Sequence, residues 1–442
     1  MATVLEFDTF LFVLNYDLNM RSWPTVVIPP LNHELPPLKL GLTAGKLPVS
    51  SAEFRMYVCG ITPYDATHLG HAATYLTFDL INRYLRLQKR QVSFVENITD
   101  IDDPLLVRAA RDSVDWKSLA TSQIELYAED MTALRVITPS HFESVTESMD
   151  LIITAIANVI EKGFTYSLDG DIYFKSKTFL AQLPIPYEQA LAEFAERGGD
   201  PDRAGKEEPL DPVLWLANKP SEPGWDAPFG FGRPGWHVEC CAIALRYLLG
   251  PNYLVDEIAR DFCIDLQGGG SDLIFPHHFM SAILGSVLTG KPFAAGYLHT
   301  GMVGLDGEKM SKSKGNLVFV SKLISSGVDP MVIRYALMQE KYSADRMWTN
   351  SVLATATSKV ENLRSALARM EVADTTSVIE GIIAAMANDL DTPKALALLD
   401  DWANETRSVR SITSTSSTIS MDKLGSAGEL SRALDSLLGL AL

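Results

Sequence analysis

Apolar and polar positions change their spacing several times between residues 54 and 103. The run RMYVCGITPY is apolar enough for a buried strand and ends in a Gly/Pro loop, GHAATYLTFDLINRYLRL has helical spacing, and QVSFVENITDIDD resembles a second strand that ends in polar residues. A strand, a helix and a second strand in this order are typical of a parallel sheet covered by helices. Ligands bind such sheets at the carboxyl ends of the strands, where both polar clusters fall. We therefore expect an α/β fold with a ligand site at that edge.

The same pattern divides the chain into segments. Proline-rich sequence follows Met20, and whether translation begins at Met1 or at Met20 stays open. The low-complexity stretch 411–420 predicts a loop. The predicted segments are an N-terminal extension and arm (1–50), the first half of an α/β domain (51–115), a mainly helical insertion (116–205), the second half of the α/β domain (206–316) and a C-terminal helical domain (317–442).

The composition limits the class of protein. The chain has 442 residues and 47% hydrophobic content, which is enough for more than one globular domain. Its formal charge is −17, from 38 basic and 55 acidic residues, so a polyanion such as RNA is a disfavoured partner. The apolar patch near the start is too short to span a bilayer. We expect neither nucleic acid nor membrane as a partner.

The cysteines indicate free thiols. Cys59, Cys240, Cys241 and Cys263 are too few for a disulfide framework in a chain of this length, and no export signal precedes them. We therefore expect a cytoplasmic protein whose thiolates are available to a metal ion.

A first signature lies in TPYDATHLGHA, the loop before the expected helix. His68 and His71 flank Gly70, so two imidazoles and a helix N-terminus face the same volume, which suits a polyphosphate. The imidazoles can donate hydrogen bonds to phosphoryl oxygens as charge develops during a displacement. Taken alone, such a motif is more often a capped helix start.

A second signature is KMSKS at 309–313, on a polar loop between LDGE and KGN. Lys309 and Lys312 can neutralise a pyrophosphate leaving group, although a short basic run is more often a solvated loop. The two signatures, in this order, resemble those of class I aminoacyl-tRNA synthetases. That resemblance implies a Rossmann-like nucleotide-binding catalytic domain that activates an amino acid as its adenylate.

Three residues are candidate metal ligands. Cys59 ends the first expected strand, Cys240 lies in GWHVECC and His277 lies in FPHH, so only folding can bring them together. Zinc prefers these ligand types, although each cysteine could equally be a packing residue. The motifs YVCGITPYDATHLGHA, ENITDIDD, GWHVEC, GGGSD-x3-PHH and KMSKS are similar to those of the cysteinyl-tRNA synthetase family. The resemblance implies that Cys59, Cys240 and His277 bind one Zn²⁺.

The same resemblance has further implications for the substrates. Ser281 stands where those synthetases have an acidic fourth ligand, so a substrate thiolate can take the open position and zinc would select cysteine over serine. ATP would enter with Mg²⁺. Asp272 could contact the ribose or the substrate amine, and Trp236 could pack against the substrate. For Asp272 a turn-capping role, and for Trp236 a place in the core, is about as common. The residues expected to line the adenylate are Cys59, Gly60, Ile61, Thr62, Thr74, Asn97, Ile98, Thr99, Trp236, Gly270, Ser271, Asp272 and Val303.

Three features resemble a related family that does not act on tRNA, the cysteine:glucosaminyl-inositol ligases of mycothiol biosynthesis. The loop ERGGDP at 196–201 matches that family, Ser281 and Pro104 depart from the synthetases, and the segment after KMSKS is short. The resemblance covers nearly the whole chain from Met20. It implies a monomeric, AMP-forming ligase that uses ATP to join L-cysteine to the amine of glucosaminyl-inositol. No base for the attacking amine is identifiable.

Departures from the family pattern leave alternatives open. Cys241 stands where Ser is usual and Phe279 replaces a customary Glu, so Cys241 or His278 could compete for the metal. One alternative is a truncated cysteinyl-tRNA synthetase, which requires a basic groove. The other is a non-catalytic, zinc-holding paralogue, which the intact His68 and His71 disfavour.

Overall fold

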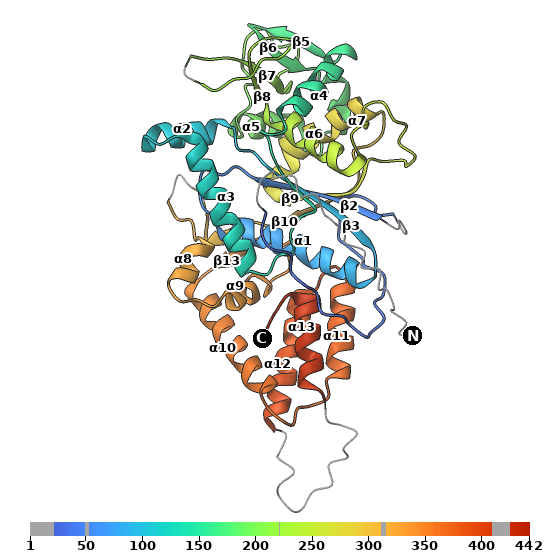
Figure 1. The fold of residues 1–442 in the computed structure, drawn as a ribbon, viewed down its shortest axis with the longest axis vertical. Helices are drawn as coiled ribbons and strands as arrows, with labels where there is room; N and C mark the ends of the chain where they lie inside the picture. Colours follow the sequence, from blue (N-terminus) through green and yellow to red (C-terminus); the bar gives the residue numbers. More distant parts are fainter. Residues whose placement is uncertain (1–21, 49–52, 221, 311–314, 409–424) are drawn as a thin grey trace, which may run out of the picture.

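The computed structural model describes residues 22–48, 53–220, 222–310, 315–408 and 425–442. Figure 1 shows three levels along the longest axis of the molecule. A parallel sheet occupies the middle, a smaller sheet with helices α4 to α7 lies at one end, and the C-terminal helices α10 to α13 lie at the other end.

The central sheet has six strands in the order β1, β10, β9, β2, β3, β4. Every pairing in it is parallel except that of the edge strand β1. The strands are β1 (Ala44–Gly45), β2 (Glu53–Ile61), β3 (Gln91–Ile98), β4 (His141–Ser144), β9 (Ile264–Gly270) and β10 (Ala294–Thr300).

The order of the parallel strands confirms the expected Rossmann-like fold. Along the chain they are β2, β3, β4, β9 and β10, which places the first strand in the centre and gives the order 3-2-1-4-5 across the sheet. The strand order therefore reverses between β2 and β9. Crevices at such switch points, outside the carboxyl ends of the strands, are where ligands bind in open α/β sheets.

Alternation along β2 builds two hydrophobic cores. Met56 and Val58 face one core, which includes helix α1, whereas Tyr57 and Cys59 face the other. Figure 1 shows α1 crossing the sheet on the side of the C-terminal helices. The helices packed around the sheet are α1 (Leu69–Leu87), α2 (Asp103–Asp112), α3 (Trp116–Ala133), α4 (Met149–Glu161), α6 (Trp236–Leu249) and α7 (Phe279–Thr289), with the short helices η2 (Ser271–Leu273) and η3 (Ile274–His278).

The inserted part of the chain contains a second, antiparallel sheet of four strands. This sheet runs across residue 205, where the sequence suggested a boundary, and β4 pairs with β3 in the central sheet although it lies within 116–205. The run DIYFKS, which contains β6, is recognisable in the sequence as an extended segment. The other strands have three to five residues, which is too short to show a period. The elements are β5 (Thr165–Leu168), β6 (Asp171–Phe174), η1 (Lys177–Gln182), α5 (Tyr187–Glu196), β7 (Val213–Ala217) and β8 (Gly232–Pro234).

The C-terminal part is helical as expected, apart from one short strand that joins a small three-stranded sheet. The predicted loop at 411–420 lies outside the described residues. The elements are β11 (Val303–Leu305), β12 (Glu308–Lys309), α8 (Val320–Ser325), α9 (Pro330–Leu337), β13 (Arg346–Trp348), α10 (Asn350–Leu367), α11 (Thr376–Ala387), α12 (Thr392–Ser408) and α13 (Ala427–Leu438).

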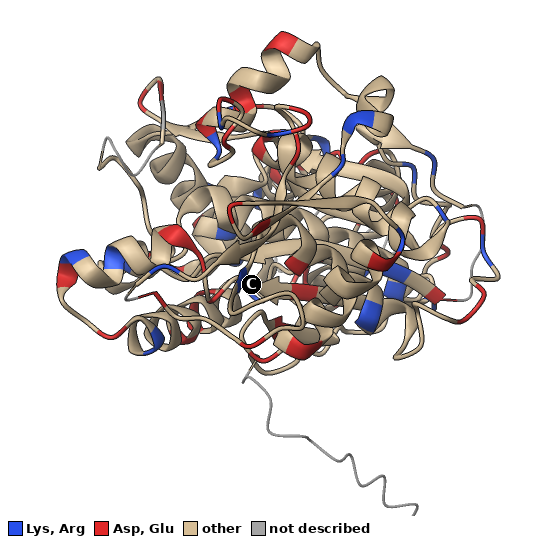
Figure 2. Ribbon diagram, turned by 90° about the horizontal axis from the view of Figure 1, so that it is seen from above, with Lys and Arg blue, Asp and Glu red and all other residues tan. Residues whose placement is uncertain are grey.

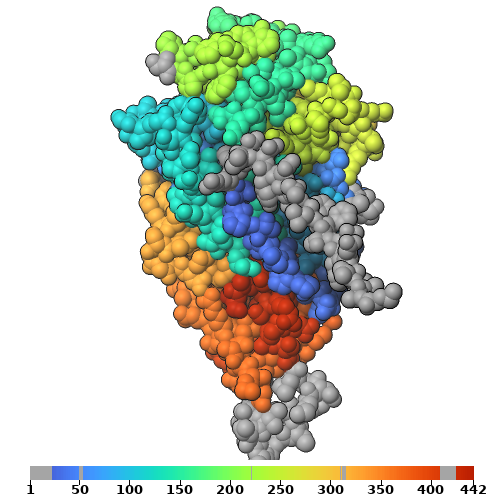
Figure 3. Space-filling model, viewed as in Figure 1, coloured from blue at the N-terminus to red at the C-terminus, as the bar shows by residue number. Residues whose placement is uncertain are grey.

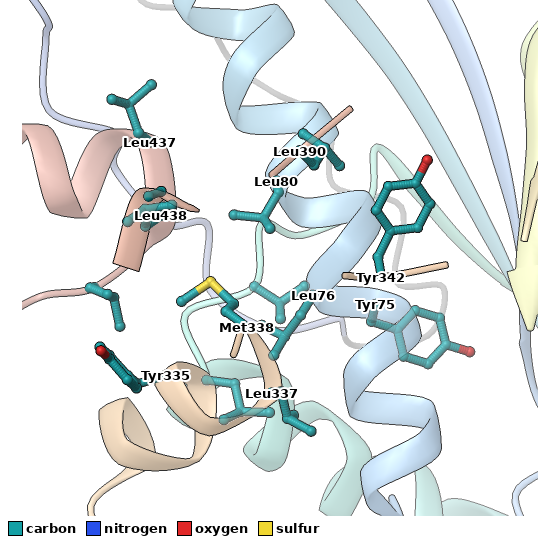
Figure 4. Close-up of a cluster of buried hydrophobic side chains, with 14 of the residues drawn as sticks. Tyr75, Leu76, Leu80, Tyr335, Leu337, Met338, Tyr342, Leu390, Leu437 and Leu438 are labelled. Carbon is teal, nitrogen blue, oxygen red and sulfur yellow. The ribbon is translucent and has the colours of Figure 1, made fainter. Parts of the chain in front are cut away.

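Helix α1 is fixed against the C-terminal helices by apolar packing and by buried charge. Figure 4 shows side chains of α1, α9 and α13 in one buried cluster. Beside it the buried Asp79 of α1 binds Arg83, at 2.7 Å, and Arg334 of α9. The Nε atom of Arg334 also donates to the carbonyl oxygen of Leu438 at 2.6 Å. Because all three charged side chains are buried, removal of Asp79 would leave two buried guanidinium groups without their carboxylate partner.

The proline-rich arm packs on the domain. Trp23 is only 4% exposed, and its indole donates to the carbonyl oxygen of Val136 at 2.8 Å. Tyr84 donates in turn to the carbonyl oxygen of Pro36 at 2.8 Å. Figure 3 shows the described part of the arm, in dark blue, along the surface next to the red C-terminal helices.

Charged residues of both signs are interspersed in the view of Figure 2, where basic positions are blue and acidic positions are red. The expectation that no nucleic acid binds stays a prediction. Among the described residues, no helix is both long enough and apolar enough to cross a membrane.

Candidate active site

The three candidate metal ligands meet at the switch point of the sheet. Cys59 lies near the end of β2, Cys240 in the second turn of α6, and His277 in η3, and all three are buried. The Sγ atom of Cys59 is 3.8 Å from Sγ of Cys240 and 3.1 Å from Nε2 of His277. In the described part of the chain, potential metal-ligand atoms from three side chains lie within 4.8 Å of one another in one group, and its members are Cys59, Cys240 and His277.

Local sequence explains why α6 starts where it does. Gly235 precedes the helix, and a Cβ atom at this position would lie 2.1 Å from the carbonyl oxygen of Val213 on β7. The chain can therefore pass close to β7 and turn into the helix only with glycine here. Five residues later this helix presents Cys240 to Cys59.

The donor set fits a tetrahedral zinc ion. With zinc–sulfur bonds of about 2.3 Å, two cysteine ligands are about 3.8 Å apart, and the structure has 3.8 Å. The Cys59–His277 separation of 3.1 Å is slightly shorter than the value of about 3.5 Å that the same geometry gives. Two thiols and one imidazole leave a fourth position for a substrate atom, as in catalytic zinc sites.

Burial sets the protonation of these ligands in the absence of a cation. It raises the pKa of the Cys240 thiol well above its usual value, and the neighbouring Cys59 raises it further. Burial also lowers the pKa of His277 well below its usual value, so the imidazole is neutral, which is the form that binds metals. A divalent cation would favour the thiolates and release their protons.

Neighbouring side chains orient the ligands. His237 Nδ1 lies 3.0 Å from His277 Nδ1, so these nitrogens share a hydrogen bond while Nε2 of His277 faces Cys59. The Trp236 ring stacks on His277, with ring centres 4.0 Å apart. The Asn97 amide donates to Sγ of Cys240 at 3.3 Å. Such outer contacts hold a metal ligand in the orientation that binding requires.

Ser281, which stands at the position of an acidic ligand in the synthetases, lies in α7 and is fully buried. Its hydroxyl donates to the backbone carbonyl of His237 at 3.3 Å. Serine here therefore holds the residue that orients His277.

The first signature forms the N-terminus of α1. His68 is the N-cap, and its Nδ1 accepts hydrogen bonds from the backbone N–H groups of Gly70, at 3.1 Å, and His71, at 3.3 Å. The two imidazole rings stack with centres 3.7 Å apart. The helix start is thus capped, as the alternative interpretation expected. The two histidines also lie together, as a phosphate-binding role requires.

The segment after the second signature pairs with the first. The backbone N–H of Leu69 donates to Val318 at 2.9 Å, and the N–H of Val320 donates to Thr67 at 3.0 Å. Lys309 ends β12 and its backbone pairs with Gly304 of β11. Lys312 lies outside the described residues. Backbone pairing therefore joins the first signature to the segment that follows the second signature.

The residues expected to line the adenylate lie mostly at the carboxyl ends of β2, β3 and β9. Gly60 donates to the Asn97 side chain at 3.0 Å, and the N–H of Thr99 donates to the Ile61 carbonyl at 3.0 Å. A Cβ atom on Gly60 would lie 1.5 Å from the Asn97 carbonyl oxygen, so only glycine permits this approach. Thr62 follows β2 directly, and Ile98 is the last residue of β3.

The other expected adenylate residues lie on α1, at the end of β9 and on the small sheet. Thr74 of α1 lies 2.8 Å from the hydroxyl of Thr300 at the end of β10. Gly270 ends β9, and Ser271 and Asp272 begin η2. Val303 is on the small sheet, where it lines a separate cavity of about 370 Å³ with residues of α9 and β13. A role for each in binding adenylate stays a prediction.

Three residues around the site were missed by sequence reasoning. His237 lies three positions before Cys240, inside a motif that was noticed, but only the fold turns its ring toward His277. Tyr57 donates to Asn97 at 2.7 Å, and its position two residues before Cys59 on a strand was a usable signal. Thr300 has no local sequence signal.

Comparisons with known proteins agree with this geometry. The domain described as tRNA synthetases class I (C) catalytic domain matches residues 46–358. The L-cysteine:1D-myo-inositol 2-amino-2-deoxy-alpha-D-glucopyranoside ligase of Gordonia bronchialis is 48% identical over 434 residues, covering 96% of this chain and 100% of that protein. The ligase of the same name from Nocardiopsis dassonvillei is 51% identical over 395 residues, covering 87% of this chain and 93% of that protein.

A solved structure of Mycobacterium tuberculosis methionyl-tRNA synthetase in complex with methionyl-adenylate aligns with a TM-score of 0.60 at 16% identity, covering 88% of each chain. At that identity the likeness concerns the fold alone. The near-complete coverage of the ligases, at about half identity, is more specific. This chain therefore belongs to the family of L-cysteine:1D-myo-inositol 2-amino-2-deoxy-alpha-D-glucopyranoside ligases, which share the catalytic domain of class I aminoacyl-tRNA synthetases.

Proposed function

We propose that this chain joins the carboxyl group of L-cysteine to the amine of glucosaminyl-inositol in an ATP-dependent reaction that releases AMP and pyrophosphate. The observation that carries the proposal is the group Cys59, Cys240 and His277 at the switch point of the sheet. The chain is also 48% identical to the L-cysteine:1D-myo-inositol 2-amino-2-deoxy-alpha-D-glucopyranoside ligase of Gordonia bronchialis. Cysteine is the substrate whose own side chain can occupy the fourth position of such a site.

The metal centre would act in selecting the substrate. A zinc ion bound to Cys59, Cys240 and His277 would supply a Lewis acid that favours the thiolate of cysteine over the harder and less acidic hydroxyl of serine. Trp236, which stacks on His277, borders the same volume and would pack against the substrate. His237 and Asn97 keep the ligands in place through the contacts described above.

The activation step would use the two signatures. The cysteine carboxylate attacks the α-phosphorus of ATP, which enters with Mg²⁺, and pyrophosphate leaves. His68 and His71 would donate to phosphoryl oxygens at the N-terminus of α1, and Lys309 and Lys312 would neutralise the leaving group. The backbone pairing of Leu69 with Val318 supports this division, because Val318 lies five residues after the second signature and is held beside the first.

In the second step the sugar amine attacks the carbonyl carbon of the cysteinyl adenylate, and AMP leaves. Here the protein mainly holds the reactants in reach of one another and stabilises charge. The strand ends of β2, β3 and β9 border the volume in which this step would take place.

The test is cysteine-dependent AMP release by purified, zinc-loaded protein with glucosaminyl-inositol in one reaction and cysteine tRNA in another. Serine replaces cysteine in a parallel pair of reactions. We expect release only with cysteine and the amino-sugar. Release with tRNA alone would contradict the proposal and indicate a truncated synthetase, and silence in every reaction would indicate a non-catalytic paralogue.

A further inference from the structure

A cavity of about 370 Å³ lies between the small three-stranded sheet and two helices of the C-terminal part. The walls of this cavity come from β11, the end of α9, β13 and the start of α10; Figure 1 draws α9, β13 and α10 in orange. Of the residues expected to line the adenylate, Val303 is the one that lines this cavity. The volume is in the range of small-ligand sites and suits a single ring. The proposed reaction gives the rest of the cavity no role.

Two hydrogen-bond donors in the wall of the cavity lack a partner. Arg346 of β13 is only 8% exposed, and its Nε atom has no hydrogen-bond partner among the described residues. The Nη1 atom of the same guanidinium group donates to the backbone carbonyl of Lys341 at 3.2 Å. The Nε2 atom of Gln339, which follows α9, is also buried and unpartnered in the described part of the chain. Buried donors normally have partners, so these two indicate a missing group with acceptor atoms.

Two carboxylates border the same cavity. Glu340 and Asp345 line it and are exposed, so they lie at its opening. The Oδ1 atom of Asp345 accepts from the backbone N–H of Met302 at 2.8 Å, which holds this side chain in place. A carboxylate can accept several hydrogen bonds. Donors inside the cavity and acceptors at its opening therefore suit a ligand whose groups both accept and donate.

The charges around the cavity favour an uncharged ligand. Burial lowers the pKa of Arg346 to about 10, and Glu340 and Asp345 oppose that change. The guanidinium group is therefore charged at neutral pH, and two carboxylates stand against it. An anion such as phosphate would be repelled by the carboxylates, and a cation would be repelled by the guanidinium group.

The remaining wall of the cavity is apolar. Val303, Leu337 and Trp348 are buried and line it. Small-molecule sites commonly combine such apolar surface with a few placed polar groups. A cyclic polyol matches both parts, because its C–H groups can pack against apolar side chains and each hydroxyl can both donate and accept.

We propose that this cavity binds an uncharged cyclic polyol. Arg346 and Gln339 donate to its hydroxyl oxygens. Glu340 and Asp345 accept from its hydroxyl groups at the opening. The polyol is either free in solution or the inositol ring of the acceptor. Val303 is three residues after Thr300, the end of β10, so the cavity begins within about 10 Å of that strand end along the chain.

The test is calorimetric titration of the full-length, zinc-loaded protein with myo-inositol and, separately, with inorganic phosphate. We expect saturable binding of one myo-inositol per chain and no binding of phosphate. Arg346→Met should weaken myo-inositol binding by about 10- to 100-fold, the usual effect of losing a hydrogen bond to a charged group. Gln339→Met keeps the length of the side chain and removes an uncharged donor, so it should weaken binding by about 2- to 10-fold.

A matched control separates the cavity from a general effect of losing an arginine. Arg364 lies on α10, pairs with Asp329 at 2.6 Å and is outside the cavity wall, so Arg364→Met should bind myo-inositol as wild type does. Urea unfolding shows whether each variant folds. Gln339→Met changes a partly exposed side chain, and it decides the question alone if Arg346→Met does not fold.

Amide formation with glucosaminyl-inositol distinguishes the two sources of polyol. If the acceptor ring occupies the cavity, Gln339→Met should raise the KM for glucosaminyl-inositol by the same factor as the Kd for myo-inositol. Added myo-inositol should then compete with the acceptor. If the ligand is a free polyol, the Kd should rise while the KM stays at the wild-type value.

Three outcomes would overturn the inference. They are the absence of saturable myo-inositol binding to wild type, binding of phosphate in its place, and equal myo-inositol affinity in wild type and the folded cavity variants. Each leaves the proposed function intact, because the titration needs neither ATP nor cysteine. A wild-type protein that binds myo-inositol but makes no amide would overturn the proposed function alone.

Discussion

The sulfur atoms of Cys59 and Cys240 lie 3.8 Å apart although 181 positions separate the two residues in the chain. One sits at the end of the central strand and the other in the helix that follows the inserted sheet. This approach depends on the whole Rossmann-like topology, which returns the chain to the switch point after the insertion. The candidate metal site is therefore a product of the fold and not of a local motif.

Replacing Cys240 with Ser should remove the metal. The substitution takes away one of the three proposed ligands. We expect zinc affinity to fall by more than about 100-fold, which is more than the loss of a residue that only orients a ligand usually causes. Chelator competition on purified protein measures this. Cys241→Ser is the matched control, because Cys241 is adjacent and equally buried but lies outside the ligand group. Equal zinc loss in both variants would contradict the ligand assignment.

Replacing His237 with Ala should weaken the metal site without removing a ligand. The change deletes the 3.0 Å contact that orients His277. We expect zinc affinity to fall by about 10- to 100-fold, as for other outer partners of metal ligands. Cobalt-substituted protein should show an altered visible absorption spectrum, which reports ligand geometry independently of activity. An unchanged affinity and spectrum would show that His237 has no such role.

Replacing His71 with Ala should impair activation. We expect cysteine-dependent exchange of pyrophosphate with ATP to fall by about 100- to 1,000-fold, the usual cost of losing one preorganised donor to a developing charge. Zinc content should stay at the wild-type level, because His71 is outside the metal group. His141→Ala, at a side chain 43% exposed on β4, is the control. Exchange at the wild-type rate in His71→Ala would refute a phosphate-binding role.

Glu96 should make stability depend on pH. Burial raises its pKa to about 8, although a hydrogen bond from Tyr127 opposes the rise. The folded pKa of Glu96 lies above the unfolded value of about 4.3. The contribution of Glu96 to the free energy of unfolding is therefore fully present below a pH of about 4.3 and is lost as the pH rises through about 8. The side chain in Glu96→Gln cannot ionise. As the pH rises from about 4.5 to 8.5, the free energy of unfolding of this variant should therefore increase relative to that of wild type by about 3–5 kcal/mol. Urea unfolding across that range measures the difference, and parallel curves would contradict it.

The central β-α-β unit was predictable from sequence because its strands are apolar and its helix is long. Residues 53–98 show both periods clearly, and β2, α1 and β3 form there. Of the inserted sheet, only β6 was recognisable, as the extended run DIYFKS, whereas β8 has three residues and includes Pro234. Its pairing with β7 is a tertiary contact that no local pattern specifies.

The candidate site was predictable only through resemblance to a family. Spacing alone does not join Cys59 to His277, and their contact across the switch point appears only in the folded chain. The backbone pairing of Leu69 with Val318 has no sequence signal, because any residue can donate through its backbone.

The measurement that tests the central claim most directly is mass spectrometry of the product formed from ATP, L-cysteine and glucosaminyl-inositol by the zinc-loaded protein. The account predicts the cysteinyl amide of glucosaminyl-inositol, with one AMP released for each amide. The absence of that amide, or its formation with serine as readily as with cysteine, would contradict the account.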